Sequence, residues 1–182
     1  MATADRTIKL DYRYPIGNFE KPSEYTDASR REAIDAIAAM PVNLRAALSG
    51  LGAKELDTPY RPDGWTVRQL VHHLADSHMN AFIRFKLAMT ENNPTIKAYN
   101  EAVWAETPDV RDLPAEVSTP IIESVHQRWV ALLRAMKPAD FARTLQHPER
   151  GSMTLDDMLA LYGWHSRHHV AHVTSLRQRN GW

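Results

Sequence analysis

Residues 154–176 are the most informative segment of the chain, and they read TLDDMLALYGWHSRHHVAHVTSL. Thr154 is a typical helix cap, and Asp156 and Asp157 place negative charge in the first turn, where the helix dipole favours it. Apolar residues and histidines then recur every three or four positions, which is the pattern of one buried helical face. The segment therefore predicts a long helix whose inward face consists of Leu155, Met158, Tyr162, His165, His169, Val173 and Leu176.

Three earlier segments show the same periodicity. The first covers about residues 23–48, and Pro41 within it is expected to kink or divide the helix. The second covers about residues 66–92, and Thr66 and Gln69 have the form of a capping box at its start. The third begins at Thr119, directly before a proline suited to the first helical turn. Each segment predicts an amphipathic helix.

Four such helices without a convincing strand predict an all-α fold, a four-helix bundle within a single domain of residues 1–182. Between the second and third helices, residues 93–118 contain three prolines and little periodicity, which predicts a long crossover with at most a short helix near 99–105. A connection of this length can return along the bundle, whereas short links join antiparallel neighbours. We therefore expect up-down-down-up topology, preceded by an extended N-terminal arm of about two dozen residues.

The composition argues against several classes of function. The chain has 22 basic and 22 acidic residues without a block of like charge, so neither nucleic acid nor an anionic membrane surface is an expected partner. No apolar run has the length of a membrane span and the first residues do not resemble a secretion signal, so the expected location is cytoplasmic. The absence of cysteine excludes thiolate nucleophiles and cysteine-ligated metals.

Seven of the nine histidines fall within residues 72–78 and 165–172. His165 and His169 are one helical turn apart on the inward face of the last helix, and His73 lies on the inward face of the second helix. Three crowded, desolvated imidazoles need several hydrogen-bond partners, whereas one divalent ion satisfies three nitrogen lone pairs at once. The pattern therefore favours a metal site formed by these three residues.

Two alternatives stay open at this point. Buried imidazoles can instead be satisfied by carbonyls and carboxylates, and His168 and His172 repeat the four-residue spacing. His168 projects about 100° away from His169, toward the edge of the inward face, so we expect it at the rim of the site. His172 is a possible substitute ligand. His78 is expected to be a packed or surface residue and not a ligand, and we assign no chemistry to His126 and His147.

Three segments make the chain resemble the YfiT branch of the DinB-like superfamily: Tyr14–Gly17, Arg61–Asn80 and Trp164–His172. The resemblance covers nearly the whole chain. It implies an up-down-down-up four-helix bundle, a homodimer, and one divalent metal ion per subunit, zinc or nickel, held by three histidines. Carried over residue by residue, those ligands are His73, His165 and His169.

The resemblance also implies an enzyme that acts on a small molecule. The family is described as metal-dependent hydrolases, and some relatives transfer low-molecular-weight thiols such as bacillithiol or mycothiol. A hydrolase that activates water, a metal-dependent S-transferase that activates a thiol, and a structural or metal-responsive bundle are therefore the three alternatives. From its position three residues after His73, Asp76 is expected either to orient a ligand or accept a proton, or to be a solvated helix residue. His168 is expected to meet an anionic substrate at the mouth of the site.

Overall fold

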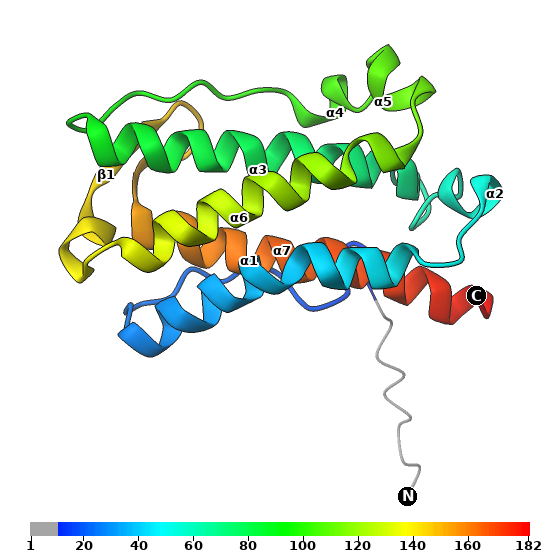
Figure 1. The fold of residues 1–182 in the computed structure, drawn as a ribbon, viewed down its shortest axis with the longest axis horizontal. Helices are drawn as coiled ribbons and strands as arrows, with labels where there is room; N and C mark the ends of the chain where they lie inside the picture. Colours follow the sequence, from blue (N-terminus) through cyan, green and yellow to red (C-terminus); the bar gives the residue numbers. More distant parts are fainter. Residues whose placement is uncertain (1–10) are drawn as a thin grey trace, which may run out of the picture.

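The computed structural model describes residues 11–182, in which four long helices form the body of the molecule (Figure 1). They are α1 (Asp27–Leu48), α3 (Val67–Thr90), α6 (Thr119–Ala135) and α7 (Leu155–Asn180). α1 and α3 each pack against both α6 and α7. In Figure 1, α1 and α7 run in one direction and α3 and α6 in the opposite direction, so the up-down-down-up four-helix bundle is confirmed.

Two of the predicted helix starts are reciprocal capping boxes. The Thr66 hydroxyl accepts a hydrogen bond from the Gln69 amide (3.1 Å), and the Gln69 side chain accepts one from the Thr66 amide (2.9 Å). Thr154 and Asp157 form the same pair of bonds at the start of α7, both at 3.0 Å. Each box satisfies amides that would otherwise lack partners at a helix end, which explains why these two starts are readable from sequence.

The connections contain shorter elements: α2 (Ala53–Leu56) between α1 and α3, and then α4 (Glu101–Trp104), α5 (Pro108–Asp112) and the 3-10 turn η1 (Ala115–Val117) in the crossover. The crossover runs back along α3, as its length predicts (Figure 1). His72 fastens it to α3, because its Nδ1 lies 2.7 Å from the Ser118 hydroxyl and its Nε2 lies 3.2 Å from the Leu113 carbonyl.

Two sequence-based expectations are wrong. The link between α6 and α7 contains the 3-10 turn η2 (Pro138–Ala142) and an antiparallel hairpin of β1 (Thr144–His147) and β2 (Gly151–Thr154), where no strand was expected. Strands of four residues are too short for an alternating pattern to show, and pairing rather than propensity defines them. In addition, the division that was expected of the first helix at Pro41 is absent, because α1 runs without interruption from Asp27 through Pro41 to Leu48.

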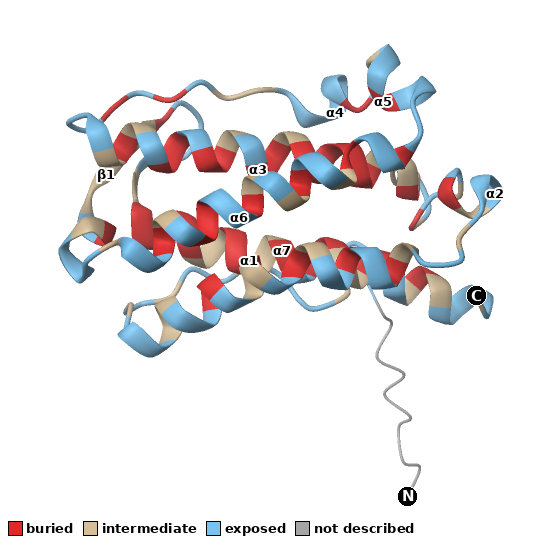
Figure 2. Ribbon diagram, in the orientation of Figure 1, coloured by how far each residue is buried: buried red, intermediate tan, exposed pale blue. Residues whose placement is uncertain are grey.

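The inward faces of the four helices pack as two clusters of buried apolar residues, which line the interior (Figure 2). α1 and α7 approach each other closely at Gly163, where an added Cβ would lie only 2.9 Å from the Cβ of Ala33. Glycine at this position therefore lets the two backbones pack closely. Within residues 11–182, none of the helices has both the length and the apolar character that crossing a membrane requires.

The described part of the N-terminal arm packs along α7 of its own chain. The Trp164 indole donates a hydrogen bond to the Gly17 carbonyl (3.2 Å), and the Tyr25 hydroxyl donates one to Asp157 (2.5 Å). The predicted extended arm is thus present from residue 11 onward, whereas its first ten residues lie outside the described part of the chain.

Candidate metal centre

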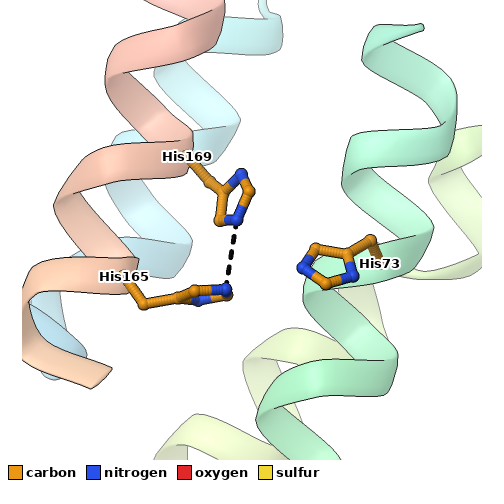
Figure 3. A group of neighbouring side chains, drawn as sticks. All are labelled: His73, His165 and His169. Carbon is orange, nitrogen blue, oxygen red and sulfur yellow. Dashed lines mark hydrogen bonds between the residues drawn. The ribbon is translucent and has the colours of Figure 1, made fainter. Parts of the chain in front are cut away.

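His165 and His169 project from successive turns of α7 toward His73 on the facing helix α3 (Figure 3). One ring nitrogen from each of the three residues lies within 4.8 Å of the others. The Nε2 atoms of His165 and His169 are 3.1 Å apart. The structure therefore brings together the three residues that the helical periodicity selects.

This geometry fits a divalent ion. Zinc-to-imidazole bonds are about 2.0–2.1 Å long, and a tetrahedral arrangement then separates two ligand nitrogens by about 3.3 Å. The 3.1 Å between His165 and His169 is close to this separation. Among the described residues, His73 makes no hydrogen bond through its ring, so its nitrogens are free to act as ligands.

Burial keeps these imidazoles in the form that binds metal. Desolvation lowers the pKa of His73 to about 4, since its side chain is almost enclosed. Desolvation also lowers the pKa of His165 and of His169 well below the usual value, and the neighbouring imidazoles lower both further. Because only neutral imidazole offers a lone pair to a metal, the site is prepared for a cation at neutral pH.

A second group of ligand atoms adjoins the first and consists of His168, His169 and His172, again within 4.8 Å of one another. The Nε2 atoms of His168 and His172 are 3.0 Å apart. His168 stacks on Trp164, with ring centroids 4.2 Å apart, and His172 packs against Tyr60 at the same distance. His169 belongs to both groups, so only the other histidines distinguish them.

A cavity of about 150 Å³ adjoins the first group. His73 and His165 form part of its wall, and Arg84, Arg150 and Glu101 line it as well. Arg84 is 7% exposed, and its guanidinium donates a hydrogen bond to the Lys97 carbonyl (3.0 Å), which fixes its position. A small molecule in this cavity would touch two of the three imidazoles and a cationic group.

Neither of the two expected catalytic residues, Asp76 and His168, belongs to the wall of this cavity. Asp76 is partly buried on α3, and burial, followed by the charge of Asp109, raises the pKa of its carboxyl to about 6. Within residues 11–182, that carboxylate makes no hydrogen bond to His73, His165 or His169. His168 lies beside the centre, 5.0 Å from His169 between ring centroids.

Two histidines without a predicted role prove to be fully enclosed. His78 is 0% exposed and His126 is 2% exposed, and their rings are hydrogen-bonded to each other. His78 is also hydrogen-bonded to His165. The available signal for His126 was its position between Ile122 and Trp129 on the inward face of the third helix, where a polar side chain requires a partner.

Comparisons with known proteins agree with this architecture. The sequence profile of the DinB superfamily matches residues 36–173. A protein of Bacillus mycoides (strain KBAB4), named as a proposed metal-dependent hydrolase, is 53% identical over 172 residues, which cover 94% of this chain and 99% of the relative. A Bacillus cereus (strain 03BB102) protein of the same name is 52% identical with the same coverage.

The solved structure of YfiT from Bacillus subtilis superimposes with a TM-score of 0.90 at 42% sequence identity. The match covers 94% of this chain and 98% of that one. YfiT is described as a probable metal-dependent hydrolase with an unusual four-helix bundle topology. The similarity thus extends over both the bundle and the helices that carry the histidines.

Proposed function

Because this chain belongs to the DinB superfamily, we propose that it is a metal-dependent hydrolase with one zinc or nickel ion per subunit. The ion is held by His73, His165 and His169, between α3 and α7. Three imidazoles suit either metal, since both accept nitrogen ligands. A small molecule in the adjoining cavity is the substrate.

The cavity is the observation that carries this proposal. A closed structural site surrounds its ion with protein ligands, whereas a catalytic site leaves a position open to water or substrate. Here the cavity wall includes His73 and His165, so a bound ion has access to a small molecule. This arrangement supports an enzyme over a bundle in which the ion only joins two helices.

The chain's own residues supply binding and proton transfer. When bound, the ion acts as a Lewis acid and lowers the pKa of water to about 7, which is the chemistry that hydrolysis needs. Arg84, held by the Lys97 carbonyl, attracts an anionic group of the substrate. Asp76, with its pKa raised to about 6, accepts and returns a proton near neutral pH. His168 packs beside the centre, with its ring centroid 5.0 Å from that of His169, and stacks on Trp164.

Metal content and hydrolysis measured on the same samples test the proposal. We would purify the chain without a histidine tag, load it with zinc or nickel, and measure the metal by mass spectrometry and turnover with a panel of small esters and amides. One ion per chain is expected. His73→Ala should lose both metal and turnover, because only the first histidine group contains His73.

His172→Ala is the matched control for metal content, because His172 belongs only to the second group. It should retain the ion. Loss of metal from His172→Ala together with full retention by His73→Ala would place the ion in the second group and contradict the proposed site.

An S-transferase differs from a hydrolase in the substrate that its metal activates, a thiol in place of water. The same samples are therefore incubated with bacillithiol, mycothiol, glutathione or coenzyme A and the electrophile monochlorobimane. Metal-dependent conjugation of a thiol without any hydrolysis would replace the proposed reaction with thiol transfer.

A further inference from the structure

A row of hydrogen bonds connects the candidate metal centre to the opposite side of the bundle. Nδ1 of His165 lies 3.0 Å from Nε2 of His78, and Nδ1 of His78 lies 2.9 Å from Nε2 of His126. Nδ1 of His126 in turn lies 2.7 Å from the carbonyl oxygen of Ile37. The row therefore passes through α7, α3, α6 and α1, which are all four long helices.

The far end of the row is the carbonyl of Ile37, which has no donor within its own helix because of a proline. In an α-helix the carbonyl of residue 37 would accept from the amide of residue 41, but residue 41 is Pro41 and has no N–H. The Ile37 carbonyl is completely buried, and the ring of His126 supplies the donor that the helix lacks. Pro41 thus removes the helical donor of this carbonyl without interrupting α1, and His126 on α6 donates the hydrogen bond in its place.

The carbonyl fixes the direction of every bond in the row. A carbonyl can only accept, so Nδ1 of His126 carries the hydrogen and its Nε2 is an acceptor. His78 must then donate from Nδ1 to His126 and accept at Nε2. His165 consequently donates from Nδ1, and the lone pair of the ring is left on Nε2.

This direction requires neutral rings, and burial supplies that condition. Desolvation lowers the pKa of His126 to about 4, and that of His78 well below its usual value. The rings of Trp129 and Tyr162 pack edge-on against His78, with centroids 5.8 and 5.4 Å away, and exclude water from it. Each neutral ring has one donor and one acceptor, so a single sequence of bonds satisfies the row.

We propose that His78 and His126 are positioning residues which fix the tautomer and the orientation of His165, so that its Nε2 lone pair faces His73 and His169. This inference rests on the proposed metal site and not on the reaction that the ion catalyses. Hydrogen bonds to the second nitrogen of a ligating histidine commonly contribute about 10- to 100-fold to metal affinity.

The first test is spectroscopic and needs no metal. Long-range proton–nitrogen correlation spectra of the ¹⁵N-labelled, metal-free protein distinguish Nδ1–H from Nε2–H in each histidine. We expect the Nδ1–H form for His126, His78 and His165. An Nε2–H form of His78 or His165 in the folded wild-type protein would overturn the inference without any variant.

The second test breaks the row at its far end. His126→Phe retains an aromatic ring at this position but removes the acceptor of His78. His78 can then carry its hydrogen on Nε2 and donate it to Nδ1 of His165, which leaves the hydrogen of His165 on Nε2. We expect His165 to change tautomer and the Kd for zinc, measured by chelator competition, to rise about 10- to 100-fold.

Two further variants separate positioning from packing. His126→Gln keeps an amide N–H that can donate to the Ile37 carbonyl and a carbonyl oxygen that can accept from His78, and we expect it to restore the wild-type tautomer of His165 and the zinc affinity. Trp129→Phe shrinks a ring that packs on both His78 and His126 but leaves every bond of the row in place, so it should lower stability and not zinc affinity. Unchanged zinc affinity in His126→Phe would overturn the inference.

The outcomes also separate this inference from the proposed function. Normal zinc binding with the Nε2–H form of His165 contradicts only the proposal that His78 and His126 position His165. Failure of the wild-type chain to bind zinc or nickel contradicts the metal site itself, and with it the positioning of a ligand. Zinc binding without hydrolysis is compatible with the positioning of His165 and contradicts only the proposed hydrolase reaction.

Discussion

His169 is the candidate ligand whose removal should have the clearest consequence, since it belongs to both groups of histidines that could hold an ion. We expect His169→Ala to lose the metal and any hydrolytic activity while the chain remains helical, because the apolar faces of the four helices supply most of the folding energy. Circular dichroism and metal content on the same samples test this. A chain that unfolds on this substitution would make the ion structural.

We expect Asp76 to transfer a proton and not to orient a metal ligand, because within the described residues its carboxylate has no hydrogen bond to the three imidazoles. We expect Asp76→Asn to retain the ion and to reduce turnover by about 10²-fold or more, which is typical for the loss of a general acid or base. A loss of metal in this variant would instead show that Asp76 orients a ligand.

The raised pKa of Asp76 also predicts an effect on stability. The folded state binds this proton more tightly than the unfolded state between about pH 4 and pH 6, so the carboxyl stabilises the fold at low pH and loses that contribution as pH rises through about 6. We therefore expect Asp76→Asn to be more stable than the wild type at pH 8, measured by urea denaturation, and the advantage to shrink toward pH 4.

At the scale of elements, the close contact between α1 and α7 leaves no room for a side chain at Gly163. Any side chain at Gly163 meets the Cβ and backbone of Ala33 at 2.9 and 3.0 Å, so the two helices must separate to admit it. We expect Gly163→Val to lower the free energy of unfolding by about 1–3 kcal/mol or more, the usual cost of overpacking. Thr174→Ala, an exposed change on the same helix, is the control and should stay within about 0.5 kcal/mol.

The whole molecule contains enough buried neutral imidazoles to be sensitive to acid. Their folded pKa values lie below the ordinary 6.5, so the unfolded state binds more protons and stability is lost as pH falls from about 6.5 toward 4. Each ring contributes a slope of up to about 1.4 kcal/mol per pH unit. The rings with pKa values of about 4 are His73, His126 and His168, and that of His172 is about 3.

We therefore expect the metal-free chain to lose most of its stability between pH 6 and pH 4, as measured by denaturant unfolding at several pH values. Because the pKa of His73 is about 4, protons compete with the ion for this ring only near that pH, so the folded protein should keep its metal at pH 6 and at pH 5 and release it nearer pH 4. Stability that is constant from pH 7 to pH 5 would contradict the assignment of neutral buried rings.

We also propose that the whole molecule is a homodimer, as the family resemblance implies. The arm contributes partly exposed aromatic residues, Tyr12 and Tyr14, which are 38% and 40% exposed and are suited to a contact between subunits. Light scattering at micromolar concentration should give twice the mass of 20.7 kDa. A monomer under these conditions would contradict the proposal.

The sequence by itself determined the features that depend on local order. These features are the caps at Thr66 and Thr154, the inward faces of the helices and the length of the crossover. They can be predicted because a capping hydrogen bond and a period of 3.6 residues involve only residues that are close together in the sequence. The same periodicity placed His73, His165 and His169 on facing helices, which the structure brings within reach of one another.

Only the tertiary structure decided the features that depend on contacts between distant segments. The β1–β2 hairpin, the cavity and the close approach at Gly163 require elements that are paired or packed in space. The row from Ile37 through His126 and His78 is the clearest case, since its bonds join residues 89, 48 and 87 positions apart. A hydrogen bond is short and directional, so sequence periodicity can turn a histidine inward but cannot choose the partner that it meets there.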